Sequence, residues 1–147
     1  MYKVILVGTD GSETASKAVS AAADVARSLG SELHIVSAFR PGSASAGMAA
    51  AAGAPMVDTG VHHAMLEESA RAVSEKAVEN FANGVNAHAH AIPGDAVDVL
   101  LDTAVGVGAD LIVVGSKGMR GARRYIGSVP NSVAHSAACD VLVVKTA

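Results

Sequence analysis

The stretch ADLIVVGSKGMRGARRYIGS, residues 109–128, gives the clearest indication of the fold of this chain. It opens with an apolar run rich in β-branched residues, which is typical of a buried strand in a parallel sheet. The segment that follows holds four glycines and several cationic side chains, and Ser128 then precedes a short helical pattern. A strand, a glycine-rich loop and a helix in this order indicate an α/β unit with a ligand site at the carboxyl end of the strand.

The same alternation extends over the whole chain. The sequence predicts strands at 2–8, 31–39, 86–92, 109–115 and 140–145, with helices at 14–29, 61–83, 95–106 and 128–138 between them. Alternating apolar strands and amphipathic helices favour one α/β domain over residues 1–147, a Rossmann-like (flavodoxin-like) three-layer fold. We expect a five-stranded parallel sheet in the order 3-2-1-4-5 with four helices. The Ala- and Gly-rich residues 40–60 predict a flexible loop, which is either a lid or partner contact or a tolerated insertion.

Composition excludes several classes of function. The chain has 147 residues, of which 50% are hydrophobic and 17% charged, and its net charge is −3. This balance gives no global attraction for nucleic acid, and the absence of Trp removes the best platform for stacked bases. No apolar run approaches the ~20 residues of a membrane span. With a single cysteine, these features predict a cytoplasmic protein without nucleic-acid or membrane partners.

Two glycine-bearing turns are expected at one edge of the sheet. The first predicted strand ends at Gly8 and continues into Thr9 and Asp10, and the fourth ends at Gly115. In the order 3-2-1-4-5, these two carboxyl ends flank the point where the strand order reverses, which is where open α/β sheets bind ligands. Ser128 is a good N-cap, and a helix amino terminus favours phosphate. The sequence therefore predicts a phosphate-bearing ligand here.

Other interpretations of the same residues stay open. Gly115, Gly118 and Gly127 are also compatible with turns that bind nothing. Asp10 either caps the first helix or holds the tight turn before it, or it contacts the ligand, and these roles are compatible with one another. Arg120 and its cationic neighbours either face solvent or contact phosphate.

The histidines and the cysteine receive structural interpretations. His88 and His90 share one face of the third predicted strand. Because neither a cysteine nor a histidine four residues away accompanies them, no metal site is predicted. Cys139 precedes the last predicted strand in an apolar setting and is expected to be an inert core thiol.

Three motifs together resemble the universal stress protein A superfamily. They are VGTDGSETASKAV at 7–19 with Asp10 inside it, GD at 94–95 opening the third helix, and G-x-x-G, a spacer and G-[ST] before VPNSVAHSAACDVLVV at 129–144. The resemblance covers essentially the whole chain and points to the ATP-binding branch. The spacer between Gly118 and Gly127 has eight residues, one fewer than is common in that branch.

The resemblance implies a homodimer through the last strand and an adenine-nucleotide site. The nucleotide would be ATP, with or without Mg²⁺, or alternatively AMP or cyclic AMP. By position, the resemblance implies roles for eleven residues, with Thr9 and Asp10 on the adenine–ribose side and the backbone of Ala38 and Phe39 beside the adenine. Val114, Gly115, Gly118 and Arg120 would lie along ribose and phosphates, and Gly127, Ser128 and Val129 would hold phosphates.

The sequence is compatible with three hypotheses about function. The preferred one is a regulatory stress-response protein that binds ATP with slow or no hydrolysis. The alternatives are a phosphotransferase or weak ATPase, and a dimeric interaction module whose site is empty or prefers AMP or cyclic AMP. Phosphoryl transfer needs a positioned base and metal ligands. Since Asp10 is the only acidic residue expected near the crevice, no catalytic residue is predicted and binding is favoured over turnover.

Overall fold

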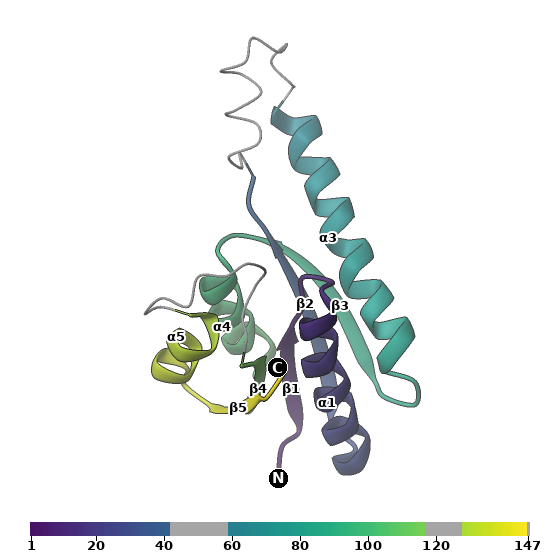
Figure 1. The fold of residues 1–147 in the computed structure, drawn as a ribbon, viewed down its shortest axis with the longest axis vertical. Coiled ribbons are helices and arrows are strands. Elements are labelled where there is room, and N and C mark those ends of the chain that lie inside the picture. Colours follow the sequence, from purple (N-terminus) through teal and green to yellow (C-terminus); the bar gives the residue numbers. More distant parts are fainter. Residues whose placement is uncertain (42–58, 117–127, 147) are drawn as a thin grey trace.

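One parallel sheet organises the protein. The computed structural model describes residues 1–41, 59–116 and 128–146. In these residues five strands lie in the order β3-β2-β1-β4-β5 (Figure 1), and four helices join them in the sequence. The strands are β1 (Val4–Gly8), β2 (Glu32–Phe39), β3 (Ala87–Pro93), β4 (Leu111–Gly115) and β5 (Asp140–Val144), and the helices are α1 (Glu13–Leu29), α3 (Thr59–Phe81), α4 (Ala96–Val107) and α5 (Val129–Ser136). The predicted strand order and the four helices are confirmed.

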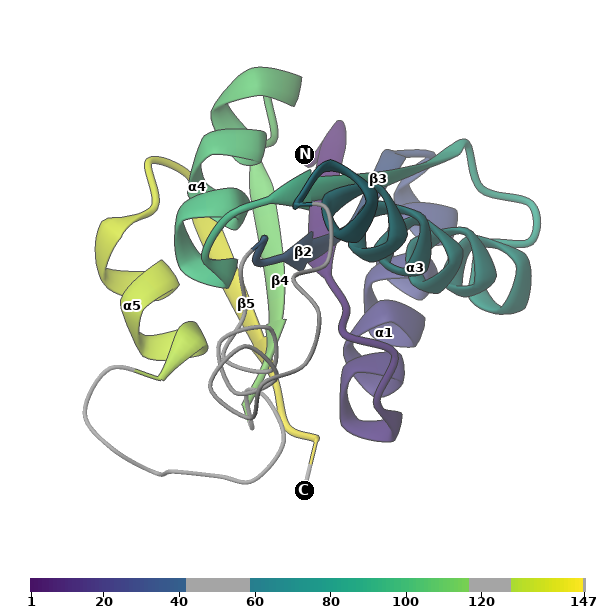
Figure 2. The ribbon, with the colours of Figure 1, turned by 90° about the horizontal axis from the view of Figure 1, so that it is seen from above.

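The helices form a layer on each face of the sheet. Viewed from above, α1 and α3 lie on one side and α4 and α5 on the other (Figure 2). Because side chains alternate along a strand, β1 contributes residues to the hydrophobic core on each face of the sheet. Ile5 and Val7 pack in the core beneath α1 and α3, whereas Leu6 packs in the core beneath α4 and α5. All three side chains are fully buried, so every position in the middle of β1 is apolar.

Short polar side chains begin three of the helices. Ser12 accepts a hydrogen bond from the amide of Ala15, and Asp95 accepts one from the amide of Val97. Ser128 accepts one from the amide of Asn131, so the expected N-cap of the last helix is confirmed.

Of the two structural roles expected for Asp10, holding the turn before the first helix is confirmed and capping that helix is wrong. Ser12, and not Asp10, is the N-cap of α1. The Asp10 Oδ1 atom accepts a hydrogen bond of 2.8 Å from the Ser12 amide. Asp10 therefore fixes the turn that leads into α1 and leaves the helix terminus to Ser12.

The first and fourth strands begin later than predicted because of one carboxylate. Asp110 accepts hydrogen bonds from the amides of Lys3 and Val4, at 2.9 to 3.1 Å. Its own amide donates to the Val4 carbonyl. The side chain of Asp110 thus holds the start of β1, and regular pairing of the two strands begins at Ile5 and Leu111.

The two edges of the sheet differ in how much apolar surface they expose. On β5, Leu142 and Val143 are 38% and 47% exposed. On β3, at the opposite edge, polar His88 and His90 occupy the same face as His34 of β2. Among the described residues, no helix is both long and apolar enough to cross a membrane.

Candidate functional site

A pocket of about 480 Å³ lies at the carboxyl ends of the central strands. It occupies the point between β1 and β4 where the strand order reverses, as the sequence predicted. Its volume is within the range of ~300–1,000 Å³ that is common for small-molecule sites. The residues around it come from β1, α1, β2, β4, α5 and the segment from Gly94 into α4; they are Gly8, Thr9, Asp10, Ser12, Thr14, Ala15, Ala18, Val36, Ala38, Arg40, Gly94, Asp95, Ala96, Val97, Val99, Leu100, Val114, Gly115, Val129 and Pro130.

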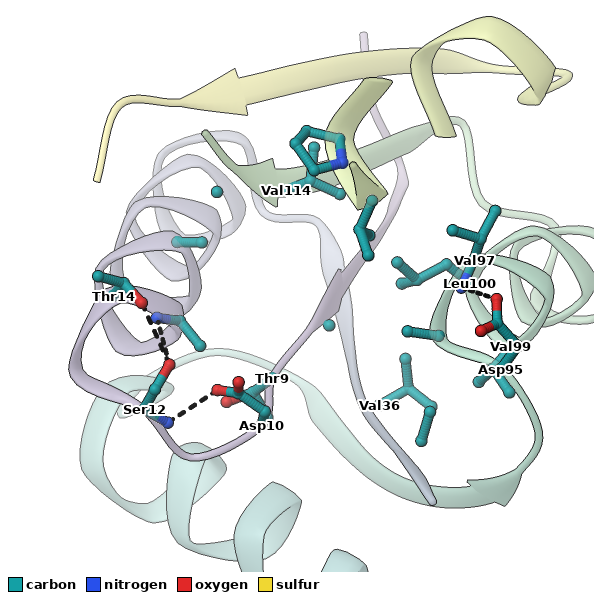
Figure 3. A pocket seen from close by; sticks show the side chains of 18 of the residues that line it. Thr9, Asp10, Ser12, Thr14, Val36, Asp95, Val97, Val99, Leu100 and Val114 are labelled. Carbon is teal, nitrogen blue, oxygen red and sulfur yellow. Dashed lines mark hydrogen bonds between the residues drawn. The ribbon is translucent and has the colours of Figure 1, made fainter. Parts of the chain in front are cut away.

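One wall of the pocket is polar and belongs to the turn between β1 and α1. Figure 3 shows Thr9, Asp10, Ser12 and Thr14 together on this side. The Thr9 Oγ1 atom accepts a hydrogen bond of 3.1 Å from the amide of Gly11, whose φ of 82° lies in the left-handed region that favours glycine. The turn is therefore fixed by its own side chains, and Asp10 remains exposed at the mouth.

The opposite wall is apolar and rigid. Val36 of β2 lies on the same side as Val97 and Leu100 of α4 (Figure 3). Ala38 of β2 also lines the pocket and packs against the same core cluster. A Cβ atom at Gly8 would lie only 3.2 Å from a methyl carbon of Leu100, so α4 approaches the end of β1 closely. Because Leu100 also belongs to the core, this wall cannot relax far without disturbing the fold.

An ion pair joins two elements at the rim. The Arg40 guanidinium, just after β2, contacts the carboxylate of Asp95 at the start of α4. Asp95 is also the N-cap of α4. Asp10 was expected to be the only acidic residue near the crevice, and this expectation is wrong because Asp95 lines the pocket as well.

The third side of the pocket is formed by β4 and α5. Val114 and Gly115 end β4, and Val129 and Pro130 begin α5. Ser128 accepts a hydrogen bond from the amide of Asn131, and Pro130 lacks an amide hydrogen and therefore fits the first turn of the helix. Its positive end faces the pocket and favours a negatively charged group.

The structure gathers most of the predicted site residues. Six of the eleven line the pocket, namely Thr9, Asp10, Ala38, Val114, Gly115 and Val129. Ser128 caps α5 next to it. Phe39 is not among the lining residues; its ring makes an edge contact with His63 of α3 at a centroid distance of 5.3 Å. Gly118, Arg120 and Gly127 lie outside the described residues.

Sequence reasoning missed the wall formed by α4 and the ion pair at the rim. Val97 and Leu100 belong to the core and also line the pocket, because the core and the wall are continuous. Arg40 was included only in a long loop. The GD pair at 94–95 was predicted to open a helix. Its position just after the third predicted strand was the one indication that Asp95 lies at the carboxyl end of a strand.

Cys139 fits the expectation of a structural thiol. It is partly buried against the core beneath α4 and α5. Burial raises the pKa of its thiol, and the neighbouring Asp140 and Asp110 carboxylates raise it further. A raised pKa disfavours the reactive thiolate.

Comparison with known proteins identifies the family. A model described as the universal stress protein family matches residues 1–145. This chain belongs to the universal stress protein family. Universal stress protein Rv1636 of Mycobacterium tuberculosis is 37% identical over 149 aligned positions, which cover 99% of this chain and 97% of that protein. Universal stress protein A homolog 2 of Coxiella burnetii is 32% identical over 146 positions, covering 98% of this chain and 95% of its own.

A solved universal stress protein shares the architecture. It was crystallised in complex with cAMP, is 31% identical to this chain and superposes with a TM-score of 0.72. The superposition covers 99% of this chain and 98% of the other. Since the family match runs from residue 1 to 145, both walls of the pocket come from the universal stress protein domain.

Proposed function

We propose that this universal stress protein binds an adenine nucleotide, ATP or a related one, in the pocket between β1 and β4. It would act as a regulatory stress-response protein in the cytoplasm, with slow or no hydrolysis. The observation that carries the proposal is the pairing of an apolar wall with a polar turn at the point where the strand order reverses.

The two walls suit the two halves of a nucleotide. The faces of a purine ring match the apolar surface of Val36, Ala38 and Leu100. In this orientation the exposed Asp10 carboxylate is available to accept hydrogen bonds from ribose hydroxyls. The phosphates would extend toward Val129, where the amino terminus of α5 provides positive potential.

Adenine nucleotides are favoured because of one relative. The solved universal stress protein at 31% identity carries cAMP, which combines an adenine base with a phosphate. ATP, AMP and cAMP share the base and ribose, so the apolar wall serves all three. The number of phosphates accepted depends on the segment between Ser116 and Ser128, which contains Gly118, Arg120 and Gly127.

Slow or absent hydrolysis is proposed because the carboxylates of Asp10 and Asp95, which line the pocket, already have hydrogen-bond or ion-pair partners. Asp95 is held by Arg40 and by the amide of Val97, so it is not placed as a general base. Asp10 is held by the Ser12 amide and is the better candidate for a Mg²⁺ that accompanies ATP, because Mg²⁺ prefers oxygen ligands. Rapid phosphoryl transfer needs both a water-orienting group and metal ligands, and one exposed carboxylate supplies only part of this set.

The first experiment identifies the nucleotide. Protein purified without added nucleotide is denatured, and mass spectrometry of the released small molecules should detect an adenine nucleotide. Calorimetric titration with ATP, AMP, cAMP and GTP then ranks the affinities, and the proposal expects each adenine nucleotide to bind more tightly than GTP. Absence of co-purified nucleotide together with no measurable heat for any adenine nucleotide would refute it. Steady-state phosphate release with excess ATP and Mg²⁺ should stay below one turnover per minute or so.

A pair of variants assigns the site. Asp10→Asn should weaken ATP binding by about tenfold, that is ~1.4 kcal/mol. Asp98→Asn removes the same charge from an exposed position in the first turn of α4, outside the pocket lining, and should leave affinity unchanged. Equal effects of the two substitutions would indicate a general charge effect instead of a contact at the pocket.

We also propose a homodimer formed through β5. The strand lies at the edge of the sheet, and its Leu142 and Val143 side chains are substantially exposed. An apolar edge strand favours pairing with another strand, and a second copy of the chain offers one. Val143→Lys should shift sedimentation to the monomer, while Val61→Lys on α3, where the valine is 52% exposed, should not. A monomeric wild type would contradict this part of the proposal.

A further inference from the structure

A cluster of histidines and one carboxylate lies on the outer strands, away from the pocket. It comprises Glu32 and His34 of β2 with His88 and His90 of β3, and we call it the histidine cluster. None of the four lines the pocket. The parallel register places His34 opposite His88, and alternate residues of a strand share a face, so all four side chains point to one side of the sheet.

The donor atoms of three of these residues converge. The Glu32 Oε1 atom lies 3.0 Å from His34 Nε2 and 3.0 Å from His88 Nε2. The three atoms all lie within 4.8 Å of one another. A cation with bonds of ~2.0–2.2 Å to such ligands needs donor atoms that are about 3.3 Å apart. The two separations from the carboxylate are close to this value, and His88, whose side chain is 46% exposed, has room to move toward His34 when a cation binds.

His90 orients the ring of His34. His34 Nδ1 and His90 Nε2 are 2.8 Å apart, so the Nδ1–H group of His34 can donate to His90 while Nε2 offers its lone pair to a cation. The ring of His34 also stacks on the rings of His88 and His90, at centroid distances of 4.8 and 5.0 Å. A hydrogen-bond partner on the second ring nitrogen is typical of histidines that ligate metals.

The cluster is half open to water. His34 is 7% exposed, and Val36, the next residue on the same face of β2, is buried. The Glu32 and His88 side chains are 38% and 46% exposed. A buried ligand on a rigid strand with two accessible ligands above it permits entry of a hydrated ion and leaves a coordination position for water.

We infer that Glu32, His34 and His88 form a binding site for one Zn²⁺ or a similar borderline divalent cation, with His90 as the positioning residue. Two imidazoles and one carboxylate form a ligand set that suits Zn²⁺, whereas Mg²⁺ and Ca²⁺ prefer oxygen ligands alone. No metal site was predicted from the sequence, because His88 and His90 were assessed on their own strand. Glu32 and His34 lie more than 50 residues earlier, on β2. This inference does not depend on nucleotide binding.

The test uses tag-free, full-length protein that has been treated with a chelator and dialysed. Zn²⁺ is titrated in competition with a chromophoric chelator at neutral pH. One equivalent should bind, and Mg²⁺ at a hundredfold higher concentration should not compete. His88→Ala and Glu32→Gln should each weaken Zn²⁺ binding at least tenfold, and both change accessible side chains, so the fold should persist by circular dichroism.

The control and the positioning residue sharpen the test. His135→Ala removes an exposed histidine of α5 outside the histidine cluster and should leave Zn²⁺ affinity unchanged. Co²⁺ should give the intense visible absorption of a tetrahedral site in wild type, and His90→Ala should shift this spectrum as well as weaken binding by about tenfold. Equal Zn²⁺ affinity in wild type and His88→Ala, or an equal loss in His135→Ala, would overturn the inference.

Discussion

The pocket at the carboxyl ends of β1 and β4 is formed by turns, helix termini and apolar side chains, whereas the histidine cluster consists of side chains on the pleated face of β2 and β3. Thr9 and Gly94 illustrate the first kind of site, because backbone conformation and close packing define it. His34 and His88 illustrate the second, because strand register alone brings them together.

This difference determines what should disrupt each site. The pocket is part of the core, so truncation of its apolar wall or strain in its turns should lower the stability of the fold. The histidine cluster lies on a sheet whose strands pair through their backbones. Substitution of an exposed member such as His88 should therefore change the free energy of unfolding little. Four predictions test or sharpen this contrast, beginning with the largest effect.

Leu100→Ala should destabilise the protein by ~2–5 kcal/mol, because Leu100 is buried and supports both the core and the pocket wall. Urea denaturation monitored by circular dichroism measures the change in the free energy of unfolding. Val105→Ala on the same helix is the control, since Val105 is 75% exposed, and it should change stability by less than ~0.5 kcal/mol. A small effect at Leu100 would mean that the wall is separate from the core.

Gly94→Ala should destabilise by ~1–3 kcal/mol. Gly94 has a φ of 140°, and a Cβ atom there would approach a methyl carbon of Val99 to 3.0 Å. Gly106, within α4, has open space around its Cα atom, so Gly106→Ala should instead stabilise by ~0.5–1 kcal/mol. The urea midpoint should therefore fall in Gly94→Ala and rise in Gly106→Ala. Midpoints that change in the same direction would contradict the inference that the turn at Gly94 requires glycine.

Gly118→Val is predicted to weaken ATP binding by about tenfold, or ~1.4 kcal/mol, because the added side chain occupies space that a phosphate needs beside the backbone. Zn²⁺ affinity should be unchanged in this variant. Conversely, His88→Ala should lose Zn²⁺ binding and retain ATP binding. Calorimetry with each ligand on both variants gives a two-way comparison, and unchanged ATP affinity in a folded Gly118→Val variant would contradict the assignment of the glycine loop.

The smallest effect should be a dependence of stability on pH that arises in the histidine cluster. Burial lowers the pKa of His34 although the Glu32 carboxylate opposes it, and burial together with His34, His88 and Arg71 lowers the pKa of His90. In the unfolded chain both titrate near 6.5. Below about pH 6.5 the unfolded state therefore binds more protons, and metal-free protein should lose stability as the pH falls.

Urea midpoints measured between pH 7.5 and 5.5 test the sign of this effect. His90→Gln should flatten the profile, because it removes one of the two groups with a lowered pKa. His135→Gln changes an exposed histidine of α5 and should leave the profile as in wild type. Stability that rises toward pH 5.5 in wild type would contradict the prediction.

Much of the fold was predictable from local patterns. Continuous apolar runs such as 111–114 specify buried parallel strands, and the short crossovers restrict the strand order to few choices. The helix starts at Asp95 and Ser128 follow from residues whose short side chains accept amide hydrogen bonds, whereas the sequence offered Asp10 for the first helix and the structure places Ser12 there. Strand starts were less accurate, since the contact of Asp110 with the first strand joins residues far apart in the sequence.

The sequence alone was enough to predict the strands and the helices, because hydrophobic periodicity is a local property, and chain connectivity narrowed the strand order to few choices. The tertiary structure was needed to show that Asp95 joins Asp10 at the pocket and that Phe39 turns toward α3. Register between β2 and β3 likewise placed Glu32 and His34 beside His88. Such side chains come from segments dozens of residues apart, and their proximity depends on how the whole sheet pairs.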